Sequence, residues 1–407
     1  MKYISHFLNQ PVYFKNERQG ILRDWVMIAG PSQAILTGLM IEDESENIRA
    51  IRISEMEPLG TKQTDLKKPL AQCQSLETND QQILLAEHIL DKQVIDIKKK
   101  KVYRVNDIEV SEEEGKLVVR WVDAGLTGMM QRLGLKGKIH HIFSRLQRRI
   151  HWADIEPIDP DLKNTFTKLS SMHPADIADI VEELGVTQGA DLIERLDAET
   201  AAETLTEVEP EMQSDIVEEI EPEDAADIIE EMEPDDAADL ISDLPKETAQ
   251  DIMEEMEPEE KDDVEELLRY PETSAGGIMN NEYLSALPES TAGEVLAMIR
   301  QEQPEPEMAY NIVVAGSDQK LLGILSLRDL VVAEPGMIVK DIMRSDLPSV
   351  KVGSPLKKVA DHFNKYDLVA LPVVNDEFQV QGLITVDDLI EIIVPQKWKI
   401  SHRKRRT

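Results

Sequence analysis

Five prolines recur at intervals of 11 to 13 residues in the middle of the chain. Each is followed by acidic and then apolar residues, as in the segment Pro222-Glu-Asp-Ala-Ala-Asp-Ile-Ile-Glu-Glu-Met. Proline at the first helical position and acids in the first turn suit the free N–H groups and the dipole of a helix start. The apolar residues fall at i, i+3, i+4 and i+7, which predicts one buried face per helix. The prolines are Pro210, Pro222, Pro234, Pro245 and Pro258.

Helices this short cannot bury an apolar face alone, so we expect them to stack into a superhelix over residues 165–270. The same region holds most of the charge. Between Met172 and Leu268, 37 acidic residues stand against three basic ones, a net charge of −34 in a chain whose formal charge is −36. Such a segment repels nucleic-acid backbones and concentrates cations, so we expect divalent cations and no DNA as its partners.

From Gly276 to Val394 the pattern changes to apolar strands that alternate with helices, in two copies about 59 residues apart. Each copy contains the motif Gly-x-x-[Ser/Thr]-x-x-Asp, which ends in Asp329 and in Asp388. A hydroxyl and free N–H groups at a helix start suit a phosphate, and the acid suits ribose hydroxyls. The alternative interpretation is a helix cap, which the same residue types also form.

Up to about Gly125, short apolar or alternating runs between turn residues predict strands. They fall into two similar units, residues 1–60 and 81–128, with a polar linker between them, and we expect each to form a small β-barrel. A basic stretch and linker follow at residues 129–160. Apolar residues at helical spacing predict a basic amphipathic helix there, either packed on its own barrel or lying on a membrane or an acidic partner. They are Ile139, Ile142, Phe143, Leu146 and Ile150.

Several classes of protein are disfavoured by what the sequence lacks. The single Cys73 argues against a disulfide framework, and the start of the chain has no apolar segment typical of secretion. No apolar run approaches the roughly 20 residues that cross a bilayer. No nucleophile–base pair or phosphate-binding loop stands out from the acidic background. We therefore expect a protein that is neither an enzyme nor itself a transporter, located in the cytoplasm or peripherally at the membrane.

Three segments of the second half resemble the cytosolic part of MgtE-family magnesium transporters: Tyr270-Pro-Glu-Thr-Ser-Ala-Gly-Gly-Ile-Met, residues 325–333 and residues 367–374. In that family an acidic superhelix precedes a pair of CBS domains. The tandem Gly-x-x-[Ser/Thr]-x-x-Asp units are themselves similar to CBS motifs, which implies that CBS 1 spans residues 271–335 and CBS 2 spans residues 336–395. A basic tail, residues 396–407, follows.

The first part resembles a second family, the PRC barrel, in tandem. The resemblance rests on Pro11-Val-Tyr with Gly20-Ile-Leu-Arg-Asp, and on residues 102–110 ahead of Asp123-Ala-Gly-Leu-Thr-Gly. It implies small barrels that dock onto other proteins or membrane complexes.

The MgtE resemblance implies Mg²⁺ between the superhelix and the CBS pair. Mg²⁺ takes oxygen ligands and keeps several waters, so one or two carboxylates per contact suffice. Two CBS-side positions that are acidic in the family fall on Pro355 and Lys357, which implies that those sites are lost. For each remaining carboxylate the alternative is a solvated surface charge. The acids that match the family's metal contacts are Glu203, Asp235, Asp239, Asp367, Asp388 and Glu391.

The CBS resemblance implies ATP or another adenine nucleotide as a ligand and a homodimer formed through the CBS pair. Leu368 stands where an aromatic residue is common in the family, which weakens the case for adenine stacking. The residues that match the family's nucleotide contacts are Tyr310, Ser326, Arg328, Asp329, Thr385 and Asp388.

The sequence thus predicts a multidomain α+β protein: small PRC-like β-barrels, an all-α acidic superhelix of short helices and a C-terminal α/β CBS pair. The predicted function is that of a Mg²⁺-responsive regulatory protein related to magnesium transport and tuned by adenine nucleotide. Its barrels would dock a separate membrane transporter or another protein. Two alternatives stay open: a non-catalytic interaction scaffold with CBS nucleotide sensing, and an RNA- or ribosome-associated factor, because PRC-like barrels occur in ribosome maturation proteins.

Overall fold

A computed structural model describes residues 2–30, 33–59, 63–76, 82–125, 148–158, 168–304, 306–346 and 348–393 of the protein. The chain divides into two compact units, Met1–Glu219 and Ile220–Thr407. The basic tail and positions 139–146 of the expected amphipathic helix lie outside the described residues. Within the described ranges, no helix has the length and apolar character needed to cross a bilayer.

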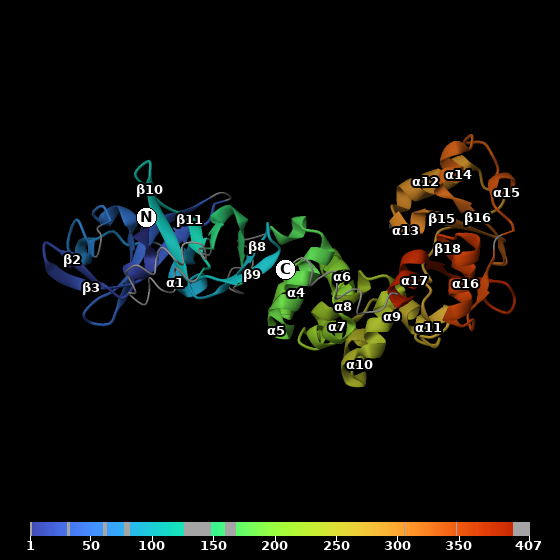
Figure 1. The fold of residues 1–407 in the computed structure, drawn as a ribbon, viewed down its shortest axis with the longest axis horizontal. Coiled ribbons are helices and arrows are strands. Elements are labelled where there is room, and N and C mark those ends of the chain that lie inside the picture. The colour runs from blue at the N-terminus through green and yellow to red at the C-terminus, as the bar shows by residue number, and fades with distance from the viewer. Residues whose placement is uncertain are drawn as a thin grey trace. The chain divides into compact units, whose positions relative to one another are not determined.

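The first unit opens with a curled sheet of ten strands, blue to cyan in Figure 1. The strands of residues 2–157 are β1 (Lys2–Tyr3), β2 (Pro11–Phe14), β3 (Glu17–Ile28), β4 (Ala34–Glu42), β5 (Ile48–Arg52), β6 (Thr64–Asp65), β7 (Gln82–Leu84), β8 (Gln93–Asp96), β9 (Lys101–Arg104), β10 (Asp107–Glu113), β11 (Lys116–Asp123), β12 (Arg149–His151) and β13 (Ile155–Pro157). The large sheet has the order β1-β10-β11-β4-β3-β2-β6, with β12 on β11, β5 on β4 and β7 on β3. The strands β13-β8-β9 form a second, smaller sheet. A short helix, α1 (Leu85–His88), follows β7.

Strands from both predicted barrel segments share this one sheet. Val118 of β11 pairs with Ile35 of β4, and a single core runs through both segments and includes Trp25 and Trp152. The expected linker also contributes, because β6 pairs with β2 and Leu66 is buried. Residues 1–60 and 81–128 therefore pack as one domain around a common core.

Ile150 differs from the sequence prediction. We expected it on a basic helix, but it lies in β12, where it pairs with Val122 of β11 and is buried. The pairing with an existing strand outweighs the local helical spacing, as tertiary contacts often do for a short segment.

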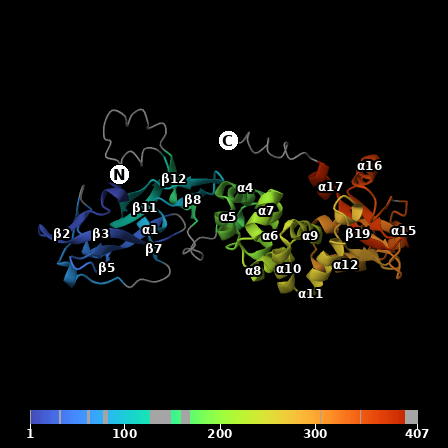
Figure 2. The ribbon, with the colours of Figure 1, turned by 90° about the horizontal axis from the view of Figure 1, so that it is seen from below.

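Among the described residues, the first unit continues after β13 with the helices α4 (Pro174–Leu184), α5 (Val186–Ile193), α6 (Ala198–Thr206) and α7 (Pro210–Val217). Helix α4 packs on α5 and α6, and α5 packs on α7, as Figure 2 shows for this unit. The β8–β9 hairpin holds α4 through an ion pair between Lys100 and Asp176 and through the amide of Val102, which donates to Glu183 Oε2 at 3.1 Å. The sheet and these helices are thus joined by polar contacts.

The second unit begins with α8 (Pro222–Glu230), α9 (Pro234–Asp243), α10 (Lys246–Glu255) and α11 (Pro258–Leu267). Helix α8 packs on α10, and α9 packs on α11. Proline opens three of these helices as expected, but Pro245 is the N-cap of α10 and precedes its first turn. The expected apolar face of α8 is buried: Ala225, Ile228, Ile229 and Met232. A continuous superhelix over residues 165–270 stays a prediction, because the two units are separate bodies.

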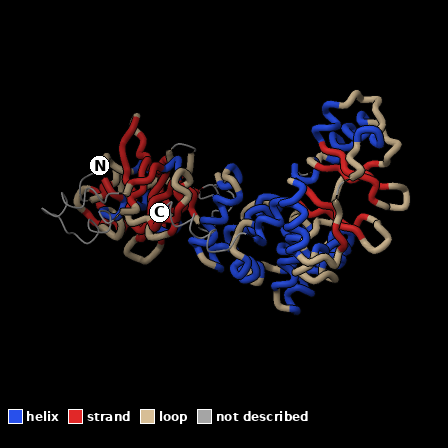
Figure 3. Tube along the Cα trace, turned by 45° about the vertical axis from the view of Figure 1, so that its right-hand side comes forward, coloured by secondary structure: helices blue, strands red, loops and turns tan. Residues whose placement is uncertain are grey.

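The strand–helix alternation folds into two similar three-stranded sheets. The elements are β14 (Ser285–Ala286), α12 (Ala292–Glu302), α13 (Pro306–Ala309), β15 (Asn311–Ala315), β16 (Leu321–Ser326), α14 (Leu327–Val332) and α15 (Val339–Ile342), then β17 (Val350–Lys351), α16 (Leu356–Tyr366), β18 (Ala370–Val374), β19 (Val380–Thr385) and α17 (Val386–Ile393). In each copy two parallel strands are followed by an antiparallel one. Figure 3 shows these sheets in red with their helices in blue.

Hydrogen bonds join the turn between β15 and β16 of the first copy to the turn between β18 and β19 of the second. The amide of Leu321 donates to the carbonyl of Phe378 at 3.1 Å, and the amide of Val380 donates to that of Gln319 at 3.0 Å. A small apolar cluster joins β15 of one copy to β18 and β19 of the other and contains Val313, Ala370, Val380 and Leu383. The pseudo-symmetric pair is therefore one domain.

Candidate functional site

The N-terminus of α9 lies against the second copy of the strand–helix fold. Asn280 is buried, and its backbone exchanges two hydrogen bonds with Leu383 of β19, both at 2.9 Å. Its side-chain amide donates to Glu233 Oε2, at the N-cap of α9, at 2.8 Å. One turn of α9 is thereby fixed next to the start of α17, both within the second unit.

The side chain of Asp235 is partly buried at this contact. Its Oδ1 atom is buried and has no hydrogen-bond partner. Burial raises the pKa of Asp235 well above its ordinary value, and the nearby carboxylates of Asp236, Asp388 and Glu233 raise it further. The side chain thus sits in a negative environment that favours either a proton or a cation.

Asp388, in the first turn of α17, approaches the same site from the CBS-like side. Its Oδ2 accepts hydrogen bonds from the hydroxyl of Thr385 at 2.7 Å and from the amide of Thr385 at 2.9 Å. Burial raises the pKa of Asp388, and those two hydrogen bonds oppose the rise. Asp235 and Asp388 are therefore two poorly solvated carboxylates, and the negative charge of Asp388 helps to raise the pKa of Asp235.

The corresponding place in the first copy is the start of α14. The Ser326 hydroxyl donates to Asp329 Oδ2 at 2.6 Å and accepts from the Asp329 amide at 3.1 Å. The carbonyl of Tyr310 accepts from the amide of Leu327 at 3.1 Å, which places Tyr310 beside the same turn. Tyr310 and Arg328 are exposed. Four of the predicted nucleotide residues are thus brought together, and both predicted acids form cap contacts with their hydroxyl neighbours.

The remaining predicted metal residues are dispersed. Glu203 is exposed on α6 in the first unit, Asp239 is exposed on α9, and Asp367 is exposed at the left-handed C-cap of α16, with φ 50°. The side chain of Glu391 lies outside the described part of the structure. Among the residues that are described, no three His, Cys, Asp or Glu side chains are grouped closely enough to hold a metal ion.

A second acidic contact, which the sequence analysis missed, lies between α11 and the loop before β14. The side-chain amide of Asn281 donates to Asp263 Oδ1 at 2.9 Å, while Asn281 Oδ1 and Glu260 Oε2 are buried without partners. Burial raises the pKa of Asp263 and of Glu282, with the surrounding acids adding to both. The adjacent asparagines of the Met279-Asn-Asn-Glu282 segment, placed just before an apolar strand, are the signal that could have revealed it.

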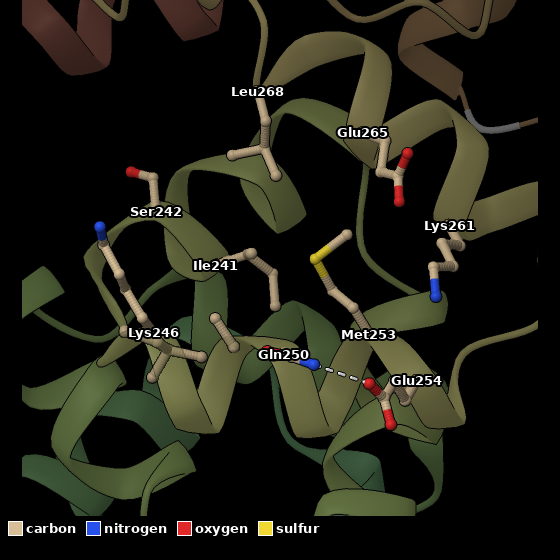
Figure 4. A pocket seen from close by; sticks show the side chains of 11 residues that line it. Ile241, Ser242, Lys246, Gln250, Met253, Glu254, Lys261, Glu265 and Leu268 are labelled. Carbon is tan, nitrogen blue, oxygen red and sulfur yellow. Dashed lines mark hydrogen bonds between the residues drawn. The ribbon is translucent and has the colours of Figure 1, made fainter.

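A groove of about 500 Å³ lies along α10 between the end of α9 and α11 (Figure 4). Its lining includes Lys246 and Lys261, the two basic residues of α8–α11. Met253 lies between them in the view of Figure 4. None of the predicted metal or nucleotide residues lines this groove. The other lining residues are Ile241, Ser242, Leu244, Ala249, Gln250, Glu254, Glu265 and Leu268.

Comparison with known families accounts for the second half of this architecture. The family model of the MgtE intracellular N domain matches residues 172–273, and that of the CBS domain matches residues 275–336 and 339–395. The chain contains an MgtE intracellular N domain followed by a CBS pair. MgtE cytosolic domains and CBS domains are regulatory rather than catalytic, and the MgtE N domain relates this part of the chain to magnesium transport. The resemblance of residues 1–60 and 81–128 to PRC barrels stays a prediction.

The relatives show how much of the chain this covers. The magnesium transporter MgtE of Thermus thermophilus is 37% identical over 139 residues, 34% of this chain and 31% of that protein. The chain thus spans about a third of the curated relatives it matches first. Two solved structures match 57% of this chain with a TM-score of 0.54. One is the soluble part of a magnesium transporter, 29% identical and 91% covered, and the other is the cytosolic domain of the Mg²⁺ channel MgtE in complex with ATP, 33% identical and 94% covered.

Proposed function

We propose that this protein is a Mg²⁺-responsive regulatory protein that binds the cation between the MgtE N domain and the CBS pair. The observation that carries the proposal is the buried, unpartnered oxygen of Asp235 beside Asp388. One of these carboxylates belongs to the MgtE N domain and the other to the CBS pair. Their negative charges repel each other until a proton or a cation neutralises them.

Mg²⁺ fits this donor set because it accepts one or two carboxylates and completes its octahedron with water. A site of that kind needs no cluster of three protein ligands. We propose Asp235 and Asp388 as its centre. The exposed acids Asp239 and Asp367, together with Glu391, would complete further hydrated contacts within the second unit, and a metal contact at Glu203 of the first unit stays a prediction.

We also propose that an adenine nucleotide binds the CBS pair, as ATP does in the related MgtE cytosolic domain. The start of α14 offers Arg328 for phosphate and the exposed ring of Tyr310 for the base. Binding would require Asp329 and Asp388 to exchange their cap contacts with Ser326 and Thr385 for ribose hydroxyls, since those contacts now occupy both acids.

The CBS pair also offers a surface for a second copy of the chain. Helices α14 and α17, which occupy equivalent places in the two copies, expose neighbouring apolar side chains. They are Val331, Val332, Ile390 and Ile393. Exposed apolar patches of this kind mark association surfaces, so we propose a homodimer through these helices.

Because the matched structures are soluble or cytosolic parts of membrane proteins, we propose that this chain acts in the cytoplasm. The curled sheet would dock a partner such as a separate membrane transporter.

Small-angle X-ray scattering of the chain, chelated and then titrated with Mg²⁺ at constant ionic strength, tests the cation site. We expect a saturable change in the radius of gyration at millimolar Mg²⁺. The variant Asp235→Asn/Asp239→Asn/Asp388→Asn should lose that change. A matched control, Asp243→Asn/Asp251→Asn/Asp262→Asn, removes three exposed acids of the same helical region and should retain it.

If K⁺ at matched ionic strength reproduces the change, or if both triple variants respond like the wild type, the cation site is refuted. The scaffold alternative would then lead, because a specific observation favours it. The groove along α10 pairs an apolar lining with two lysines in an otherwise acidic region. Loss of a partner on replacing Lys246 and Lys261 by glutamate would support it.

A further inference from the structure

Three acidic residues are buried on neighbouring strands of the curled sheet, far in sequence from the proposed cation site. Asp107, Asp123 and Glu109 are 0%, 1% and 7% exposed. Asp107 of β10 and Asp123 of β11 are directly opposite each other in the antiparallel register. Opposite residues in such a pair project to the same face of the sheet, so the two carboxyl groups are neighbours. Acids are almost never this buried unless they are paired.

The two carboxyl groups have unequal sets of hydrogen-bond donors. Asp107 accepts from the Ser5 hydroxyl at 2.5 Å, from the Ser5 amide at 3.2 Å and from the Ile108 amide at 2.8 Å. Asp123 Oδ1 accepts from the Gly125 amide at 2.7 Å, but Asp123 Oδ2 is buried with no partner. Burying a charged carboxylate oxygen without a hydrogen-bond donor costs desolvation free energy, so the ionised form of Asp123 is disfavoured.

The charged and titratable groups around the pair come from every strand packed against it. Tyr3 of β1 is buried beside the acids, and His6, in the turn after β1, has a buried Nε2 atom without a partner. Arg149 of β12 forms an ion pair with Glu109 and stacks on the ring of Trp121. The ion pair of Arg149 is thus with Glu109. The charge of Arg149 still lowers the pKa of Asp123, and that of His6 lowers the pKa of Asp107, but neither outweighs burial.

Two neighbouring buried carboxyl groups disfavour the state in which both are ionised. A proton on the pair removes the repulsion between them, and on Asp123 Oδ2 it also removes the charge from an oxygen that has no donor. Burial raises the pKa of Asp107, and it raises that of Asp123 to about 6, with the charge of Asp107 adding to the rise.

We propose that Asp107 and Asp123 form a proton-binding site in which the pair shares one proton and releases it as the pH rises. Release leaves two adjacent buried charges at the end of β11, where Asp123 also holds the amide of Gly125. The curled sheet is thus a second chemical sensor in the same chain, responsive to pH instead of Mg²⁺.

Infrared difference spectroscopy of the full chain with ¹³C-labelled aspartate tests the proposal, because a protonated carboxyl has a C=O band that an ionised one lacks. We expect one such band to disappear with a midpoint near pH 6. The band with this midpoint should be absent from Asp123→Asn, and in Asp107→Asn its midpoint should move to lower pH because the Asp107 charge no longer adds to the rise. Subtracting variant from wild-type spectra removes the contribution of other buried aspartates.

Two further results keep the test decisive. Ser5→Ala removes a donor to the charged form of Asp107, so it should move the midpoint upwards by about one pH unit while the sheet stays folded. The exposed Asp262→Asn variant should leave both band and midpoint unchanged. The proposal is overturned if the band survives in Asp123→Asn. It is also overturned if the midpoint falls with Mg²⁺ or K⁺ concentration at constant ionic strength, because a metal ion would then be the ligand.

Discussion

Replacing Glu156 by glutamine should flatten the pH dependence of stability of the first unit. Glu156 lies in β13 and is 3% exposed, with Oε2 buried and unpartnered. The nearest cations are Lys168, whose ammonium donates to the carbonyls of Ala153 and Ile155 at 3.0 Å, and Arg195 of the helical region. Burial raises the pKa of Glu156 to about 7, although these two cations lower it.

The sign and size of this pH dependence follow from the difference between the folded and the unfolded pKa of Glu156. The pKa of an unfolded glutamate is 4.5, so the folded protein keeps this proton at pH values where the unfolded chain has lost it. The unfolding free energy is therefore highest below pH 4.5, where the folded and the unfolded chain both hold the proton. It falls as the pH rises through 7. The full loss is about 3 kcal/mol, of which about 2 kcal/mol falls between pH 5.5 and pH 8.5.

Urea unfolding followed by tryptophan fluorescence measures this loss, because Trp25, Trp121 and Trp152 all belong to the curled sheet domain. With an m-value of about 2–3 kcal/mol per M, the wild-type midpoint should fall by about 0.7–1 M more than that of Glu156→Gln over this pH range. The exposed Glu112→Gln variant of β10 should follow the wild type. Parallel midpoint curves for wild type and Glu156→Gln would refute the argument.

Three further predictions concern contacts that hold the domains. Gly382→Ala would place a Cβ atom 2.6 Å from the carbonyl oxygen of Asn280, so it should lower the thermal midpoint of the CBS pair in calorimetry. Ser326→Ala should cost about 1 kcal/mol in chemical unfolding of the CBS pair because α14 loses its N-cap, whereas Ser326→Thr should not. Arg149→Met should destabilise the curled sheet by about 3–5 kcal/mol because it leaves Glu109 buried and unpaired, and adding Glu109→Gln should restore part of that loss.

The alternation of strands and helices in the CBS region could be predicted from the sequence. Both copies have it: strand β15 and helix α14 lie in the first, and helix α16 and strand β18 in the second. Here the local signals agree with the fold, because each apolar run is short, α12 and α14 have side-chain caps, and each strand pairs with a neighbour close in sequence.

The N-terminal sheet could be predicted as strands but not as one domain. The pairing of Val118 with Ile35 joins residues more than 80 positions apart, and no local pattern encodes such a contact. Residues 102–110 do not form one strand: at Val105 and Asn106 the chain passes from β9 in the small sheet to β10 in the large one.

For the candidate site, the sequence identified acids but could not rank them. Glu203, Asp239 and Asp367 are exposed, whereas Asp235 is the one with a buried, unpartnered oxygen. Burial depends on Asn280, which reaches α9 from a distant part of the chain through Glu233. That contact was invisible to reasoning from spacing.

A dense negative charge is therefore a poor guide to where a ligand binds, even in a chain built on it. Exposed carboxylates share their field with water and salt, so each interacts weakly with any one ion. A carboxylate whose oxygen is buried without a donor has lost that hydration and gains most from a neutralising partner. By this criterion Asp123, Glu156, Asp235 and Glu260 stand apart from the other described acids. Asp235 lies near a carboxylate from another domain, which favours a hydrated cation, and Asp123 is opposite one in its own sheet, which favours a proton.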